Sequence, residues 1–313
     1  MTLQSRQPLV LGTRASKLAL QQSRWVAEQV MNLNPGLRVE LKEIRTSGDK
    51  ILDVPLAKIG GKGLFVKEIE DALLARDIDF AVHSMKDVPT QLPDGLDIVC
   101  VPPREDPRDA LIAREVKRFE DLPCGATIGT SSLRRQAQLL HHRPDLVVEM
   151  LRGNLDTRLR KLREGLYDAI VLAAAGLKRL GWQEQVTQYL PVEISLPAIG
   201  QGALGIEARR DDAFVVSILA RLEDAAARSA VTAERALLHR LEGGCQVPIA
   251  GHASLQGDRL RLAALVGRVD GSRLVHDQLE GPLSDASRIG AELAERLLRQ
   301  GAREILDQIY GRT

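Results

Sequence analysis

Strand-like and helix-like segments alternate through the first two thirds of this chain of 313 residues, and no other feature restricts its fold as strongly. A short apolar run at 8–12 precedes a helix pattern at 16–31, which begins with a capping serine. An alternating strand pattern at 37–44 and an amphipathic segment at 65–76 follow, and then an apolar strand at 78–82. Such a β-α-β order predicts parallel sheets with helices on both faces.

The same order returns in the middle of the chain. Strands are expected at 126–130, 146–150 and 169–173, with helices from Ser132 and at 154–164. Crossovers between two α/β domains are expected at the proline-bearing segments 102–103 and 195–197. The predicted division is domain 1 at 1–102 and 203–220, domain 2 at 103–202 and domain 3 at 221–313.

The last ninety residues have a different pattern. A helix at 225–241 precedes two strands at 251–255 and 260–266, joined by a Gly257-Asp258 turn, and an amphipathic helix at 284–299 ends the pattern. The expected fold class is therefore α/β, with two doubly wound domains joined by two crossovers and a small C-terminal α+β domain. Periplasmic binding proteins share the two-domain layout.

The charge balance excludes several classes of function. Lys and Arg number 43 against 42 Asp and Glu, so no overall field attracts nucleic acid or a membrane surface. Aromatic residues are only 3%, which disfavours base stacking. Any anion site must therefore be a local cluster of basic residues.

The three cysteines, Cys100, Cys124 and Cys245, are too few and too scattered for a disulfide framework or a zinc site. We expect no metal. The first ten residues lack the apolar core of a signal peptide, and no run of 18 apolar residues occurs. These features predict a cytoplasmic protein.

The segment His83–Pro89 directly follows the strand expected at 78–82. Ligands in open parallel sheets lie at the carboxyl ends of the strands, so Asp87 is well placed to reach one. The neighbouring Lys86 would favour its ionised form. The alternative is an aspartate that only caps a turn before the proline.

Three expected strand-to-helix junctions each carry arginine. Free backbone N–H groups, hydroxyls and guanidinium groups at such a helix start can bind carboxylate or phosphate. Three of them together indicate an extended ligand with several carboxylates. Otherwise the serines and Asn154 are plain caps and the arginines are solvated. The side chains concerned are Arg14 and Ser16, then Ser132, Arg134 and Arg135, and finally Arg152 and Arg158.

The glycine-rich segment 58–63 carries Lys58 and Lys62 but does not match a phosphate-binding P-loop, which would need glycine in place of Leu56 and Ser or Thr in place of Gly63. We interpret it as a mobile loop over an anionic site, or simply as a flexible surface loop.

The segment 200–205 matches the G-x-G-x-x-G pattern of dinucleotide-binding proteins. Its context does not fit, because Pro197 interrupts the preceding strand and 204–207 is strand-like rather than helical. A tight turn between domains explains the glycines better than a nicotinamide site.

Cys245 lies on a glycine-flanked loop at 242–248, where a bulky ligand can approach the backbone. A thiol hydrolase using His239 or His252 as base is one interpretation, and a buried structural cysteine is another.

Together these segments resemble the hydroxymethylbilane synthase family, also called porphobilinogen deaminases. The strings His-Ser-Met-Lys-Asp and Glu-Gly-Gly-Cys-Gln-Val-Pro are specific to that resemblance. The matching segments lie along nearly the whole chain: 62–65, 83–89, 104–109, 129–136, 151–158 and 242–248.

The resemblance implies a transferase that polymerises porphobilinogen on a dipyrromethane cofactor, which Cys245 holds by a thioether bond. Asp87 would be the catalytic carboxylate, and Lys58 and Lys62 would belong to the active-site loop. The implied cofactor ligands are Lys86, Ser132, Arg134 and Arg135, and the implied substrate ligands are Arg14, Ser16, Arg152 and Arg158. A non-catalytic anion-binding protein, a nicotinamide-dependent oxidoreductase and a nucleic-acid-binding protein are the alternatives. We expect a monomer.

Overall fold

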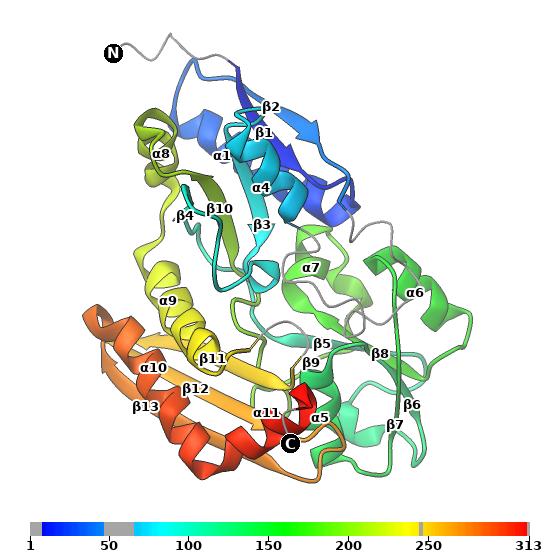
Figure 1. The fold of residues 1–313 in the computed structure, drawn as a ribbon. Helices are drawn as coiled ribbons and strands as arrows, with labels where there is room; N and C mark the ends of the chain where they lie inside the picture. The colour runs from blue at the N-terminus through cyan, green and yellow to red at the C-terminus, as the bar shows by residue number, and fades with distance from the viewer. Residues whose placement is uncertain (1–7, 47–65, 244–246, 312–313) are drawn as a thin grey trace. The chain divides into compact units, whose positions relative to one another are not determined.

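The computed structural model describes residues 8–46, 66–243 and 247–311. The chain forms two compact units, one of residues 1–104 and 203–228 and the other of residues 105–202 and 229–313. Each unit contains a five-stranded sheet, and the second unit also contains a three-stranded sheet (Figure 1). No helix in the described ranges is long and apolar enough to cross a membrane.

The sheet of the first unit has the strand order β2-β1-β3-β10-β4. β1 runs parallel to β2 and β3, whereas β10 runs antiparallel to β3 and β4. The strands are β1 (Leu9–Thr13), β2 (Val39–Glu43), β3 (Phe80–Ser84), β4 (Leu96–Cys100) and β10 (Leu204–Arg209).

Helices cover both faces of this sheet because its central strands are apolar on both sides. Helix α1 (Lys17–Leu33) and helix α8 (Ala213–Leu219) pack on one face, against side chains such as Leu11, Phe80 and Ile206. Helix α4 (Lys67–Leu74) packs on the other face, with Ile69 and Leu73 fully buried.

The sheet of the second unit has the order β7-β6-β8-β5-β9, with β5 antiparallel to β8 and β9 and the rest parallel. Helices α6 (Leu155–Arg163) and α7 (Ala174–Arg179) pack on one face, and α5 (Leu133–His142) packs on the other. The strands are β5 (Asp109–Ala113), β6 (Thr127–Gly129), β7 (Val147–Glu149), β8 (Ala169–Ala173) and β9 (Gln188–Tyr189).

The C-terminal part of the second unit is an antiparallel sheet with its own core. Strands β11 (Ile249–Gln256), β12 (Arg259–Gly267) and β13 (Leu274–Pro282) pair in that order. They pack against α9 (Ala225–Arg240), α10 (Ala286–Leu297) and α11 (Arg303–Tyr310). Each fully buried leucine in this core contributes about 2 kcal/mol of hydrophobic stabilisation.

The predicted fold class is confirmed, since two α/β sheets precede a small α+β region. The expectation that the sheets are parallel is wrong for β5 and β10. Each of these strands begins shortly after the chain passes from one unit to the other. Alternation along the sequence gives the place of such a strand but not its direction. No sequence pattern indicated β4, β5, β9, β13, α8 and α11.

Candidate functional site

The carboxyl end of β3 carries Asp87 on a short 3-10 turn at Met85–Asp87. The Met85 N–H donates to the Ala203 carbonyl at 3.0 Å, and the Val88 N–H donates to the Met85 carbonyl at 3.1 Å. These bonds hold the turn against β10. The Asp87 side chain is half-buried, and no side chain in the described ranges hydrogen-bonds to its carboxylate. The carboxylate is therefore available to a ligand.

Arg14 and Ser16 lie at the same edge of the sheet as Lys86 and Asp87. β1 and β3 are adjacent parallel strands, so their carboxyl ends meet there. The Ser16 hydroxyl accepts from the Ala19 N–H at 3.3 Å and so caps α1. The fold thus brings four of the candidate residues predicted from the sequence to one edge of the sheet in the first unit.

The start of α5 in the second unit is more deeply buried. The Ser132 hydroxyl caps the helix by accepting from the Arg135 N–H at 3.4 Å. Arg134 and Arg135 are only 4% and 6% exposed. Their guanidinium groups lie 2.8 Å and 2.7 Å from the two carboxylate oxygens of Asp109. Both arginines thus have an internal partner, which sequence reasoning missed because Asp109 is far away in the chain.

Asp109 is fully buried and is surrounded by donors. Besides the two arginines, the Ser195 hydroxyl donates to it at 2.7 Å and the Gln201 amide donates at 2.9 Å. Burial alone would raise the pKa of Asp109, but the charges and hydrogen bonds of Arg134 and Arg135 hold that pKa well below its usual range. The group therefore stays ionised at every physiological pH.

Arg152 and Arg158 follow β7, which runs parallel to β6, so they lie at the same sheet edge as the start of α5. The Arg158 Nε donates to the Gly153 carbonyl at 2.8 Å. Asn154 precedes α6 but makes no side-chain cap, unlike the two serines. Both arginines are half-buried.

Arg179 is another arginine that follows a strand of this sheet, although the sequence analysis did not select it. It lies on α7, the helix that directly follows β8, and its guanidinium donates to the Gly202 carbonyl at 2.6 Å. Burial lowers its pKa to about 10, and the charge of Glu105 opposes that shift. An arginine on a helix that follows a strand was the signal that could have found it.

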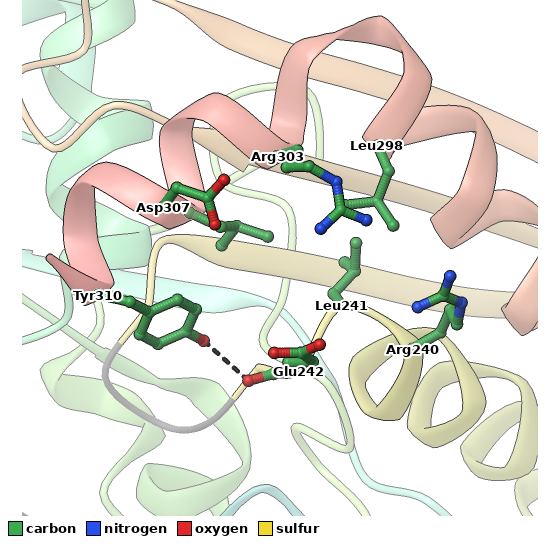
Figure 2. Close-up of a pocket in the computed structure, with 8 residues that line it drawn as sticks. Arg240, Leu241, Glu242, Leu298, Arg303, Asp307 and Tyr310 are labelled. Carbon is green, nitrogen blue, oxygen red and sulfur yellow. Dashed lines mark hydrogen bonds between the residues drawn. The ribbon is translucent and has the colours of Figure 1, made fainter. Parts of the chain in front are cut away.

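Lys58, Lys62 and Cys245 lie outside the described residues. The chain before Cys245 is described up to Gly243, where α9 has ended and Glu242 has a positive φ of 54°. The Tyr310 hydroxyl of α11 donates to the Glu242 carbonyl at 2.8 Å (Figure 2). A hollow of about 20 Å³, room for a single water, adjoins this bond, with charged side chains from α9 and α11 around it.

The glycines at 200–205 do not form a dinucleotide site. β10 begins at Leu204, so a strand rather than a helix follows them. Gly202 has a φ of +88°, and a Cβ there would lie 2.3 Å from the Glu105 carbonyl oxygen. The glycines serve a tight turn, as the sequence context predicted. Among the described residues, no cluster of His, Cys, Asp and Glu could hold a metal ion.

The Asp87 carboxylate is available to a ligand, and arginines lie at the carboxyl ends of parallel strands. These features are typical of an α/β protein that binds anionic ligands. Comparison with known proteins narrows this class. Residues 9–217 match the family model described as porphobilinogen deaminase, dipyromethane cofactor binding domain. Residues 229–299 match porphobilinogen deaminase, C-terminal domain.

The relatives agree with the family models. The porphobilinogen deaminase of Geobacter metallireducens is 59% identical over 97% of this chain and 95% of its own length. That of Geobacter sulfurreducens is 58% identical over the same shares. A periplasmic substrate-binding protein of an ABC transporter from Coxiella burnetii, 14% identical, matches 71% of this chain and 94% of its own with a TM-score of 0.43. The chain belongs to the porphobilinogen deaminase family, as its motifs predicted.

Proposed function

We propose that this protein is a porphobilinogen deaminase (EC 2.5.1.61), a transferase of tetrapyrrole and haem biosynthesis. It deaminates four porphobilinogen molecules and joins them head to tail into the linear tetrapyrrole hydroxymethylbilane. The observation that carries this proposal is the match of residues 9–217 to a family model named for its cofactor, dipyrromethane. Identity of 59% over 97% of the chain supports the same activity.

The residues fit a dipyrromethane cofactor, which presents carboxylates that guanidinium groups recognise. Arg134 supports this fit, because its buried Nε has no acceptor in the described part of the chain although its other nitrogens are bonded. In this proposal Cys245 holds the cofactor covalently, and Lys86, Ser132, Arg134 and Arg135 bind its side groups. The bound cofactor supplies a free pyrrole carbon on which the chain grows.

Asp87 is the proposed catalytic residue. The C–N bond of the substrate's aminomethyl group breaks with loss of ammonia, and the remaining carbon forms a C–C bond with the free α-carbon of the chain. That α-carbon then loses its proton. Positive charge develops on the pyrrole nitrogens, and a carboxylate beside their N–H groups stabilises it. The same carboxylate can carry the protons as acid and base.

The remaining arginines suit a substrate with two carboxylates on every pyrrole. Arg14, Ser16, Arg152 and Arg158 are the proposed substrate ligands, and Lys58 and Lys62 are proposed for the active-site loop. The proposal also includes three domains, at 1–102 with 203–220, at 103–202 and at 221–313. We place the protein in the cytoplasm as a monomer, without nucleic-acid or membrane partners.

The denatured intact mass of the purified protein tests this function, with Cys245→Ser beside it. We expect an excess of two pyrrole units on the parent protein and none on the variant. A parent protein that stays bare after incubation with porphobilinogen would leave an anion-binding protein and would end the synthase proposal.

A further inference from the structure

A buried acid–imidazole cluster lies in the first unit, beneath α4. The His83 Nε2 lies 2.9 Å from the Glu207 Oε2, and the two side chains are 4% and 1% exposed. Glu70, on α4, is 7% exposed and faces the same interior. None of the three residues belongs to the proposed catalytic or binding set. Charged side chains are rarely fully buried unless they are paired or hydrogen-bonded.

The sheet places His83 and Glu207 on one face. β3 and β10 pair in antiparallel register, with His83 opposite Gly205 and Ala81 opposite Glu207. Directly opposed residues share a face, and so do residues two apart, so the imidazole and the carboxylate are diagonal neighbours there. α4 covers this face with its apolar side chains, among them Ile69.

No other charged side chain in the described ranges hydrogen-bonds to the cluster. Arg209, also on β10, is already bonded to the carbonyls of Leu73 and Ile78 and to Asp212. β1 and β4 contribute apolar side chains against α4, and α4 itself adds Asp71. Two carboxylates therefore face one imidazole.

The cluster has unused hydrogen-bonding capacity. The Oε1 atoms of Glu70 and Glu207 are both buried without a partner within the described ranges. Burial raises the pKa of Glu70 to about 7, helped by the charges of Glu207 and Asp71 and opposed by His83. Glu70 thus keeps a proton near neutral pH, beside the hydrogen-bonded pair of His83 and Glu207.

The cluster lies next to the segment that carries Asp87. His83 is the second-last residue of β3, and the catalytic turn starts two residues later. On the same face, the Met85 side chain lies over Gly205 so closely that a Cβ there would approach its Cε to 2.8 Å. The Met85 N–H donates to the Ala203 carbonyl just beyond. Any change in how β3 pairs with β10 near His83 therefore moves the turn.

We propose that His83, Glu207 and Glu70 are positioning residues for Asp87: as a buried cluster beneath α4, they fix the paired ends of β3 and β10. This inference rests on the proposed function, in which Asp87 acts on the substrate. The cluster itself touches no substrate. Its expected effect is therefore on the chemical step and not on substrate or cofactor binding.

The first test is steady-state kinetics of His83→Gln and Glu207→Gln in the full-length, cofactor-loaded protein. We expect kcat to fall about tenfold or more while KM stays within about twofold, because a misplaced carboxylate affects the transition state. The intact mass should still show the cofactor. Ser84→Ala is the matched control, because Ser84 is the next residue of β3 and bonds to Gln22 at 3.0 Å from the other face. Its kcat should stay near that of the parent.

The second test is the pH dependence of stability with Glu70→Gln. Glu70 binds its proton more tightly in the folded state, so its contribution is present below the ordinary glutamate pKa of 4.5 and is lost as pH rises through about 7. The urea midpoint of the parent should fall across this window more than that of Glu70→Gln. An amide mimics the protonated carboxyl, so the kcat of Glu70→Gln should stay close to that of the parent at pH values below about 7.

Either test can overturn the inference. If His83→Gln and Glu207→Gln fold and keep kcat within about twofold, or raise KM instead, the cluster does not position Asp87. If neither variant folds, the urea midpoints of the parent and of Glu70→Gln decide. A parallel fall of the two midpoints with pH would show that Glu70 does not keep its proton in the cluster, and this would reject the inference. Failure of the proposed function is distinct, since it would show as a bare mass or an active Asp87→Asn.

Discussion

The two five-stranded sheets each bury an acidic side chain, but against different partners. Both have one antiparallel strand in the fourth position, β10 in the first unit and β5 in the second. Each of these strands carries a buried carboxylate, Glu207 on β10 and Asp109 on β5. Glu207 faces His83 and lies near Glu70, whose pKa is raised to about 7, mainly by burial. Asp109 faces Arg134 and Arg135, whose charges do not depend on pH.

The partner therefore decides what the buried acid does. The Asp109 cluster is a fixed charge network that joins β5, α5 and the segment 195–201. Because the pKa of Asp109 is depressed, its contribution to stability is constant above its unfolded pKa and is lost only in strong acid. The Glu207 cluster includes Glu70, which gains or loses its proton near neutral pH. We predict that the first unit has the pH-sensitive core and the second a pH-insensitive one.

The largest effect should come from Asp87→Asn, which touches neither cluster. Loss of the proposed acid–base carboxylate should lower kcat about a hundredfold to ten-thousandfold without changing the unfolding midpoint. Turnover assays and urea unfolding on the same preparation measure both. A variant with near-normal turnover would remove Asp87 from its role, and then the cluster of His83, Glu207 and Glu70 would have no catalytic group to position.

Asp109→Ala should cause the largest loss of stability, about 3–5 kcal/mol, because it leaves two buried guanidinium groups without their carboxylate. Urea unfolding at neutral pH measures the loss. Asp211→Ala is the control, since the Arg76–Asp211 pair is 52% and 69% exposed and should contribute almost nothing. A loss for Asp109→Ala as small as for the control would mean that the arginines find other partners, and the contrast between the sheets would fail.

Glu207→Ala should cost less, about 1–3 kcal/mol, because it leaves one buried imidazole without its partner rather than two buried guanidinium groups. The loss should be greater at about pH 6 than at about pH 8, because the charge of Glu207 helps to raise the pKa of Glu70 and its removal favours the ionised Glu70 that forms at the higher pH. Unfolding at the two pH values measures the difference. Equal losses for Glu207→Ala and Asp109→Ala at the higher pH would show that stability depends on both buried acids to the same extent, and the distinction between the clusters would disappear.

The sequence predicted the parts of this molecule that depend on local pattern. Alternating strands and helices indicated the fold class, and residues directly after strands indicated Asp87 and the arginines at helix starts. The partners of these residues were missed because they are distant in the chain. Asp109 is 25 residues from Arg134, and Glu207 is 124 residues from His83. Nothing near Asp109 or Glu207 distinguishes a buried acid from an exposed one, and strand direction after a crossover is equally non-local.

The smallest effect concerns a third polar contact, which is more open to solvent than either cluster. The Tyr310 hydroxyl donates to the Glu242 carbonyl at 2.8 Å, at the edge of the hollow in Figure 2. Tyr310→Phe removes only this hydroxyl, and water can replace it at the carbonyl, so we expect a loss of about 1 kcal/mol or less. Thermal unfolding measures it, with Gln308→Ala, an exposed neighbour on α11, as the control. A loss comparable to that of Glu207→Ala would mean that a solvent-accessible contact contributes as much to the free energy of unfolding as a buried one. That result would contradict the conclusion that the buried acids of the two sheets contribute more than exposed polar contacts.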